Sequence, residues 1–199
     1  MVPLSIRTPR LLLRPWAESD RAEIKRILTV SGNHFRNWWP LQPENDTLDA
    51  EFDRFLKRCQ DDDASGSGCR RVAEILEGAN PTGRIAGMFS LSQIFRAFFQ
   101  NCYIGWSISL DCVNKGYATE AVTGMLDLAF APEPGGLGLH RVQANIIPTN
   151  AASLRVAEKC GFRNEGIAKA YLQIAGKWED HVTFAKVAEE HTVPARPSA

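Results

Sequence analysis

The sequence predicts a single α/β (α+β) domain in which helices flank a central mixed sheet of six to seven strands. Segments with the alternating apolar pattern of half-buried strands are interspersed with segments whose apolar residues recur at helical spacing. A strand, helix, strand order from Ile104 to Ile146 implies a crossover, which joins parallel strands. With 199 residues, 44% of them apolar, the chain can bury one sizeable core. We therefore expect one domain over residues 1–190 and a disordered tail over 191–199.

The first third of the chain predicts a strand followed by helices. Residues 10–14 form a short apolar strand. Helical spacing of apolar residues begins near Ser19, and Gly32 is a residue type that ends helices. Thr47 can cap a further helix, because its hydroxyl can accept a bond from a free backbone N–H of the first turn.

Two segments of this region allow more than one interpretation. Residues 34–40 are rich in aromatic side chains, and Phe35 and Trp39 could form a buried helix face or the wall of a substrate site. The aspartates at 61–63 could invite a metal ion, but the solvated end of a helix explains them better. We therefore predict no metal site.

Strands dominate after residue 70. Residues 71–76 and 84–91 predict a hairpin with its turn at 78–83, and residues 100–110 a third strand. The elements expected after these are a helix that follows Gly116, a strand at 140–147, a helix capped by Thr149 or Asn150 and ended by Gly161, and a hairpin of strands 168–174 and 178–187.

Composition excludes several classes of protein. The 23 basic residues balance 23 acidic ones, so we expect no direct binding to nucleic acid and none to an anionic membrane. The five cysteines are odd in number and lack metal-ligand spacing, which favours reduced thiols in the cytosol. No signal peptide and no run of eighteen apolar residues is present. We therefore expect a cytoplasmic protein.

The stretch 113–121 lies where a strand gives way to a helix. The first N–H groups of such a helix are unpaired and carry partial positive charge, which favours phosphate. Gly116 permits close approach of the backbone, and Asn114 tolerates positive φ. Taken alone, the pattern also fits a turn in which glycine serves geometry only. It is neither a Walker A loop nor a dinucleotide-binding glycine motif.

Four stretches together resemble the Gcn5-related N-acetyltransferase (GNAT) superfamily. They are residues 8–14, residues 104–106 with 114–121, residues 150 and 153 with 157–162, and residues 176–181. Within the superfamily the chain is similar to the ribosomal-protein N-acetyltransferases of the RimJ and RimL type. The motifs at 38–40, 102–103 and 180–182 are most like the RimJ branch, which acetylates an N-terminal alanine of a ribosomal protein.

This resemblance implies a GNAT fold with splayed parallel strands that form an acyl-CoA cleft, and acetyl-CoA as cofactor. It implies direct attack, in a ternary complex, by the α-amine of a protein N-terminus, with Ala or Ser first. The chain would act as a monomer or homodimer. The residues implied in cofactor binding are Trp106, Ser107, Ile108, Val113, Asn114, Lys115, Gly116, Tyr117, Ala118, Thr119, Asn145 and Asn150.

The resemblance also implies catalytic roles for Asn150 and Ser153. Asn150 would bond the pantetheine arm, and the Ser153 hydroxyl would protonate the leaving thiolate. Ala157 stands where many superfamily members carry a tyrosine for that purpose, while Val113 and Asn114 replace the usual start of the phosphate loop. The side chains expected to line the acceptor entrance are His34, Trp38, Trp39, Tyr171 and Trp178.

The general base and the acceptor stay open at this stage. Glu120 and Asp180 are the carboxylate candidates, and His34 or His181 could relay a proton. One alternative acceptor is a small amine such as an antibiotic or polyamine. A second alternative is a non-catalytic acyl-CoA-binding protein that acts in ribosome assembly or regulation.

Overall fold

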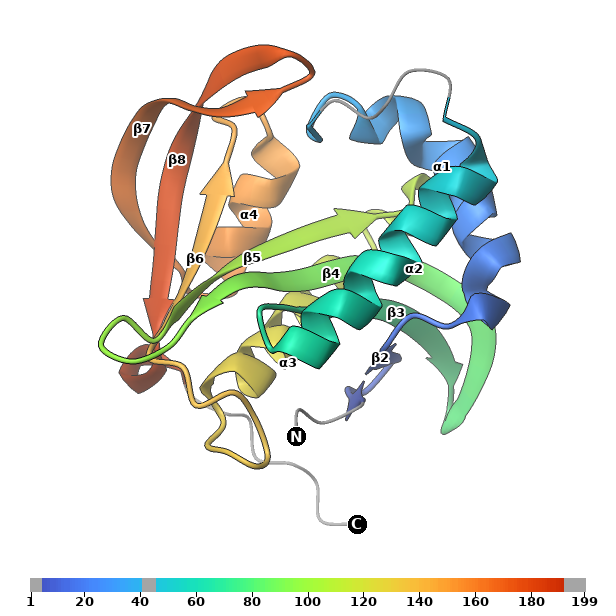
Figure 1. Cartoon of the computed structure of the whole chain (residues 1–199), viewed down its shortest axis with the longest axis horizontal. Helices are drawn as coiled ribbons and strands as arrows, with labels where there is room; N and C mark the ends of the chain where they lie inside the picture. The colour runs from blue at the N-terminus through green and yellow to red at the C-terminus, as the bar shows by residue number, and fades with distance from the viewer. Residues whose placement is uncertain (1–4, 41–45, 192–199) are drawn as a thin grey trace.

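The computed structural model describes residues 5–40 and 46–191. Within these residues, four α-helices flank a sheet (Figure 1). The helices are α1 (Arg21–Phe35), α2 (Leu48–Ser65), α3 (Tyr117–Phe130) and α4 (Ala151–Lys159). The strands are β1 (Ile6–Arg7), β2 (Leu11–Arg14), β3 (Cys69–Glu77), β4 (Asn80–Phe95), β5 (Asn101–Ile108), β6 (Arg141–Ile146), β7 (Arg163–Ile174) and β8 (Lys177–Val187).

All eight strands belong to one mixed sheet of order β1-β2-β3-β4-β5-β6-β8-β7. Only the β5–β6 pair is parallel, and α3 makes the crossover between the two strands. The α/β prediction is confirmed, but the sheet has one strand more than the expected six to seven. The extra strand is β1, which pairs with β2 through two residues, Ile6 and Arg7. Two residues are too few to produce a detectable alternating pattern.

The parallel pair separates soon after it begins. Only three residue pairs join β5 to β6, from Asn101–Arg141 to Tyr103–Gln143. Beyond Tyr103 the two strands diverge, and this gap is plain in Figure 1 between β5 and the arrow of β6. The edges of β5 and β6 that face the gap pair with no other strand in the described part of the chain. The predicted splay is therefore present.

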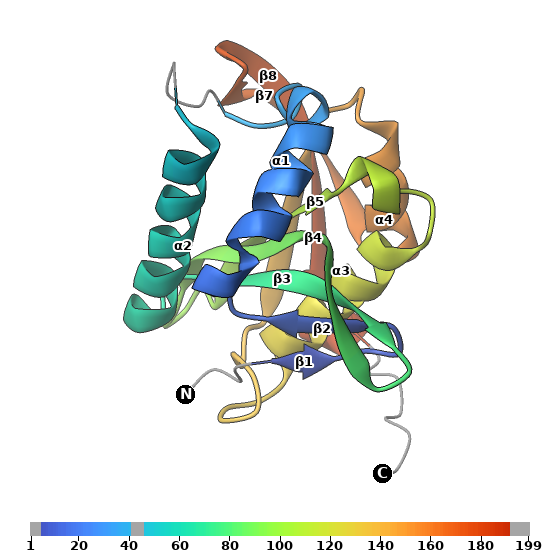
Figure 2. The ribbon, with the colours of Figure 1, turned by 90° about the vertical axis from the view of Figure 1, so that its right-hand side faces the viewer.

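Each face of the sheet carries its own pair of helices (Figures 1 and 2). One core packs α1 and α2 against the sheet through Ile24, Phe52 and Met88. The larger core packs α3 and α4 against the opposite face. Because side chains alternate between faces along a strand, successive residues of β5 point to different helix pairs. The gap between β5 and β6 therefore opens toward both layers.

The ends of several elements match the signals in the sequence. The Thr47 hydroxyl accepts a bond from the Ala50 N–H at 3.1 Å and caps α2. Gly161 follows α4 with a φ of 73°. However, α1 continues through Gly32 to Phe35, whose side chain is buried. Burial of that aromatic ring outweighs the low helix propensity of glycine.

The hairpin turn is shorter than the predicted 78–83. Leu76 pairs with Pro81 and Glu77 with Asn80, so strand pairing continues up to the turn.

Two aspartates of the acidic triplet at 61–63 form ion pairs with arginines of β3. Asp62 pairs with Arg70, and Asp63 pairs with Arg71. Among the described residues there is no group of three or more side chains suited to a metal ion.

His191 is packed against the domain rather than belonging to the tail that the sequence predicts. Its Nε2 lies 2.7 Å from Asp127 Oδ1, and its ring lies 5.2 Å from that of Phe130. The remainder of the predicted tail, residues 192–199, lies outside the described residues. None of the helices in the described ranges has the length and apolar character needed to cross a bilayer.

Candidate active site

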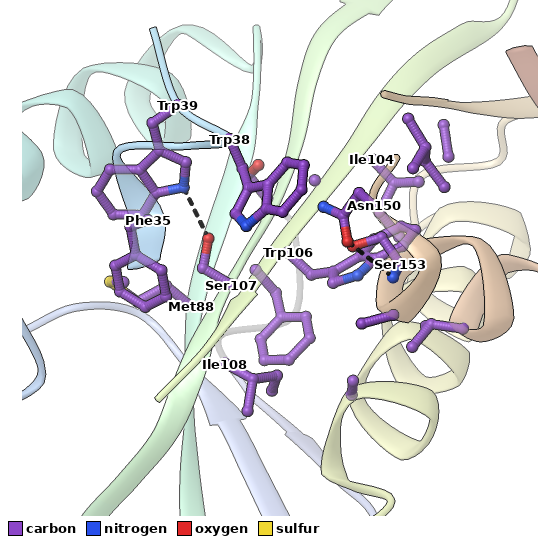
Figure 3. Close-up of a pocket in the computed structure, with 18 of the residues that line it drawn as sticks. Phe35, Trp38, Trp39, Met88, Ile104, Trp106, Ser107, Ile108, Asn150 and Ser153 are labelled. Atoms are coloured by element: carbon purple, nitrogen blue, oxygen red, sulfur yellow. Dashed lines mark hydrogen bonds between the residues drawn. The ribbon is translucent and has the colours of Figure 1, made fainter. Parts of the chain in front are cut away.

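The gap between β5 and β6 holds a cavity of about 840 Å³. Residues of both strands, of the 113–119 loop and of α4 line one part of it. Side chains of α1, α2 and the segment 38–40 line the other part. Figure 3 shows this arrangement, with Trp38 and Trp39 on one side of β5 and Asn150 and Ser153 on the other. The cavity therefore connects the two helix layers through the sheet.

The loop that precedes α3 can bind an anion. Asn114 and Gly116 have φ values of 60° and 81°, which turn the chain into the helix. Gly116 is the N-cap of α3, and no side chain among the described residues caps the helix. The first-turn N–H groups at Tyr117, Ala118 and Thr119 thus lack intrahelical acceptors, and these residues line the cavity. This end of the cavity fits a pyrophosphate group.

Of residues 113–115, all predicted to bind the cofactor, Val113 and Asn114 line the cavity and Lys115 does not. The Lys115 ammonium donates to the carbonyl of Asp111 at 2.9 Å, which draws it back along the loop. Arg155 and Lys159 bring positive charge here instead. They lie one turn apart on α4, and neither forms an ion pair or hydrogen bond with a residue that the structure describes.

Arg10 fastens the loop to the N-terminal segment. Its Nη1 donates to the Lys115 carbonyl at 2.9 Å, and its guanidinium carbon lies 4.8 Å from the centre of the Tyr117 ring. Its Nε bonds Glu120 Oε2 at 2.7 Å, while Thr8 Oγ1 bonds Glu120 Oε1 at 2.7 Å. Glu120 is therefore occupied in structure and does not line the cavity, which removes it as a candidate base.

Asn150 and Ser153 meet at the N-terminus of α4. Asn150 Oδ1 accepts the Ser153 backbone N–H at 3.1 Å, which caps the helix. A cap requires an acceptor, so the side-chain amide must direct Nδ2 elsewhere, and in Figure 3 this nitrogen points across the cavity toward Trp38. The Ser153 hydroxyl lines the cavity and makes no hydrogen bond within the described residues. Both groups are available to a ligand.

Trp106 and Ile108 line the cavity on the side of α3. Between them Ser107 faces the opposite layer, where its hydroxyl accepts the Trp39 indole N–H at 3.0 Å. The Trp39 ring stacks on Phe35 with centroids 4.7 Å apart. Phe35 is buried at the end of α1, whereas Trp39 lies beyond the helix, so the two do not form one helix face. Both side chains line the cavity, and their contact with a substrate stays a prediction.

His34 and Trp38 complete this aromatic wall. Both side chains line the cavity, and their rings meet edge to face with centroids 6.3 Å apart. Trp178, in contrast, is 66% exposed and does not line the cavity. The β7–β8 turn does reach the aromatic wall, since the Ala175 N–H donates to the Trp39 carbonyl at 3.2 Å. The Trp178 side chain beside this turn is exposed to solvent, which is why it does not line the cavity as predicted.

Asn145, on β6, is a polar residue of the cavity wall. Its Nδ2 donates to the Tyr171 hydroxyl at 3.3 Å. The predicted entrance residue Tyr171 does not line the cavity itself and bonds the lining residue Asn145 instead. Burial, together with a hydrogen bond to Tyr103, raises the pKa of the Tyr171 phenol. Tyr171 therefore stays protonated and positions Asn145.

His181 is the buried titratable side chain of this wall, with 3% of its surface exposed. Its Nδ1 lies 3.0 Å from the carbonyl oxygen of Glu179. A carbonyl only accepts hydrogen bonds, so Nδ1 carries the proton and Nε2 keeps its lone pair in the neutral ring. His181 can therefore accept a proton from a substrate at Nε2.

No aspartate or glutamate of the described residues lines the cavity. Asp180, the other candidate base, bonds the Lys169 ammonium at 2.7 Å and the Ala170 N–H at 2.9 Å. These two donors, Lys169 foremost, lower its pKa. Asp180 thus stabilises the β7–β8 hairpin.

The sequence did not identify the guanidinium groups of Arg54, Arg58 and Arg70 as lining residues. Arg54 and Arg58 lie one turn apart on α2, beside the lining residues Phe55 and Cys59. Residues four apart share a helix face, so the spacing of Arg54 and Arg58 in the sequence could have indicated that both lie on the same side of α2.

Comparisons with known proteins agree with this geometry. The acetyltransferase (GNAT) domain model matches residues 10–163. The chain is 43% identical over 102 residues to the probable N-acetyltransferase YjcK of Bacillus subtilis, a match that spans about half of each protein, 51% of this chain and 54% of YjcK. It is 27% identical over 188 residues to the ribosomal protein uS5-alanine N-acetyltransferase of Escherichia coli, covering 94% of this chain and 92% of that one.

Among solved structures, Mycobacterium smegmatis RimJ in complex with CoA-disulfide superimposes with a TM-score of 0.80. That match has 25% sequence identity and covers 94% of this chain and 87% of the other. The family model spans most of the chain, including the loop before α3 and the whole of α4. The chain therefore belongs to the GNAT family of acetyltransferases, whose acetyl donor is acetyl-CoA.

Proposed function

We propose that this protein transfers the acetyl group of acetyl-CoA to the α-amine of a protein N-terminus that begins with Ala or Ser. The cavity that crosses the sheet carries this proposal, because it brings an anion-binding helix terminus and an aromatic acceptor wall to the same gap. Similarity to the uS5-alanine N-acetyltransferase along nearly the whole chain favours a ribosomal protein in the cytoplasm as the acceptor.

Acetyl-CoA would supply an activated thioester, and the residues present fit it. The N–H groups at Tyr117, Ala118 and Thr119 would bind the pyrophosphate, with Arg155 and Lys159 supplying charge. The pantetheine arm would lie along the unpaired edges of β5 and β6, where backbone groups can pair with its amides. Asn150, the residue that caps α4, would donate a further hydrogen bond from Nδ2 to the pantetheine arm.

The acceptor amine must be neutral to attack. A free α-amine titrates near pH 8, so roughly a tenth is neutral at pH 7, whereas a lysine side chain near 10.4 is almost wholly charged. None of the aspartates and glutamates that the structure describes lines the cavity to remove this difference, which favours an α-amine over a lysine. His181 Nε2 would take the proton that the amine loses as the new C–N bond forms.

Two further groups complete the chemistry. Negative charge develops on the carbonyl oxygen during the attack, and backbone N–H groups on the unpaired edge of β5 would stabilise it. The Ser153 hydroxyl would donate its proton to the departing thiolate and recover one from solvent. Transfer would be direct, in a ternary complex, because the cavity connects the cofactor side to the acceptor side through the sheet.

Release of thiol tests the proposal. Purified protein would be mixed with acetyl-CoA and short peptides that start with free Ala, free Ser or acetyl-blocked Ala, and a chromogenic disulfide would report the thiol. All five cysteines are buried, and burial raises the pKa of Cys59, Cys69 and Cys102 to about 12, so the protein adds little background. We expect release with the free peptides and none with the blocked one.

The same assay separates the alternatives. Release only with a polyamine or an aminoglycoside would make the protein a small-amine acetyltransferase. Saturable binding of acetyl-CoA without release by any acceptor would indicate a binding protein. The variant His181→Gln tests the base: we expect a fall in kcat of roughly 100-fold with unchanged acetyl-CoA affinity.

A further inference from the structure

The part of the cavity between α2 and the sheet carries a cluster of basic side chains. Arg54 and Arg58 project from one face of α2, and Arg70 reaches the same space from β3. We call these three residues the arginine arm. It lies on the same side of the sheet as Trp38 and Trp39, and therefore on the acceptor side.

The members of the arginine arm differ in how they are neutralised. Arg54 pairs with Asp46, and Arg70 Nε lies 2.6 Å from Asp62 Oδ2. Neither aspartate lines the cavity. Arg58 forms no ion pair or hydrogen bond with any residue in the described ranges. Its charge therefore remains available to a ligand.

The neighbouring indole groups add donors rather than acceptors. Trp16 Nε1 and Trp38 Nε1 are buried and have no hydrogen-bond partner in the part of the chain that the structure describes. Both rings line the cavity. A wall with unused donors and positive charge is complementary to an oxygen-rich, negatively charged group.

The acceptor amine reaches the cavity mostly as a cation, so this wall disfavours any ligand with further positive charge. A compensating carboxylate on the acceptor would remove that penalty and form a charge-assisted bond with a guanidinium. We propose that the arginine arm binds an acidic side chain of the acceptor peptide, at one of the positions that follow its N-terminal residue. This inference rests on the proposed function and names the class of N-terminus that the enzyme selects.

A peptide scan tests it. Peptides with free N-terminal Ala would carry a single Glu or its neutral isostere Gln at position 2, 3, 4 or 5, and kcat/KM would be measured for each. We expect one Glu position to exceed its Gln counterpart by roughly tenfold at low salt, and the difference to shrink as salt rises. Arg58→Gln should abolish the preference and Arg58→Lys should retain part of it.

The matched control is Lys57→Gln. Lys57 precedes Arg58 on α2 but pairs with Asp61 in solvent and does not line the cavity, so its loss should leave the Glu preference intact. Arg58→Glu should favour a peptide with Lys at the selected position, and its thermal unfolding should match that of the wild type. Equal rates for Glu and Gln peptides at every position, or a preference that survives Arg58→Gln, would overturn this inference and leave the proposed function standing. Failure of every free-amine peptide would overturn the proposed function with it.

Discussion

Asn150 Oδ1 accepts the backbone N–H of Ser153 at 3.1 Å, so a single side chain both caps α4 and directs its remaining donor into the cavity. The variant Asn150→Asp should separate these two roles. A carboxylate keeps the cap and suits the helix dipole, so stability should hold, but loss of Nδ2 should weaken acetyl-CoA binding about tenfold or more. Thermal unfolding and calorimetric titration with acetyl-CoA measure the two effects.

Thr47→Ala is the control for the cap alone. Its hydroxyl caps α2 but does not line the cavity, so its removal should cost about 1 kcal/mol of stability and leave acetyl-CoA affinity unchanged. An Asn150→Asp protein that binds acetyl-CoA normally would contradict the role of Nδ2.

Ser153→Ala removes a hydroxyl that has no partner in the described structure. Because no internal hydrogen bond is lost, the free energy of unfolding should stay within about 0.5 kcal/mol of the wild type. Without the proton donor, kcat should fall by roughly 100-fold while KM for acetyl-CoA changes little. Steady-state kinetics with a free-Ala peptide provide the measurement, and an unchanged kcat would leave thiolate protonation to water.

Arg10→Ala should loosen the phosphate loop from the N-terminal segment. The change removes the bonds from Arg10 to the Lys115 carbonyl and to Glu120, so the loop must be ordered when the cofactor binds. We expect the Kd for acetyl-CoA to rise by about five- to tenfold, with kcat at saturation nearly unchanged. Arg7→Ala is the matched control, because Arg7 bonds the Ala79 carbonyl, away from the loop. Equal effects of the two variants would refute the fastening role.

Glu165 provides a test of stability against pH. Its carboxylate bonds Arg141 first and Arg163 second, and these bonds lower its pKa from 4.5 to about 2. A depressed folded-state pKa stabilises the protein above the unfolded pKa, and this contribution is lost as pH falls from about 4.5 toward 2. Glu165→Gln should therefore cost about 0.5–1 kcal/mol at pH 7 and progressively less below pH 4.5.

Urea unfolding from pH 3 to pH 7 measures this difference. Glu158→Gln, on the exposed face of α4 and without an ion pair to a described residue, should show no such dependence. A constant gap between wild type and Glu165→Gln across the range would exclude the ion pairs as its source.

Local chemistry made part of the site predictable. The change from strand to helix around Gly116 and the capping residue Asn150 are both set by neighbouring residues, and both lie where the sequence places them. Ser153 lies in the turn that follows this cap, but only the resemblance to the acetyltransferases singled it out. Such features depend on backbone requirements within a few residues, which a single sequence displays directly.

Other parts of the site depend on contacts between distant segments. His181 enters the cavity because β8 pairs with β6 in one register, and Arg58 because α2 packs in one rotation on the sheet. Lys115 and Trp178 have suitable chemistry, yet neither lines the cavity: the Lys115 ammonium bonds the Asp111 carbonyl, and the Trp178 side chain is exposed to solvent. No local pattern carries that information, and the two-residue strand β1 likewise forms only because β2 is there to pair with it.

The most direct test of the central claim is to locate the new acetyl group. A peptide with a free N-terminal Ala and one internal Lys would be incubated with enzyme and acetyl-CoA, then fragmented in a mass spectrometer. We predict a single acetyl group on the α-amine of Ala, and none when that amine is already blocked. Acetylation of the lysine side chain, or addition of a further acetyl group to the blocked peptide, would contradict α-amine transfer.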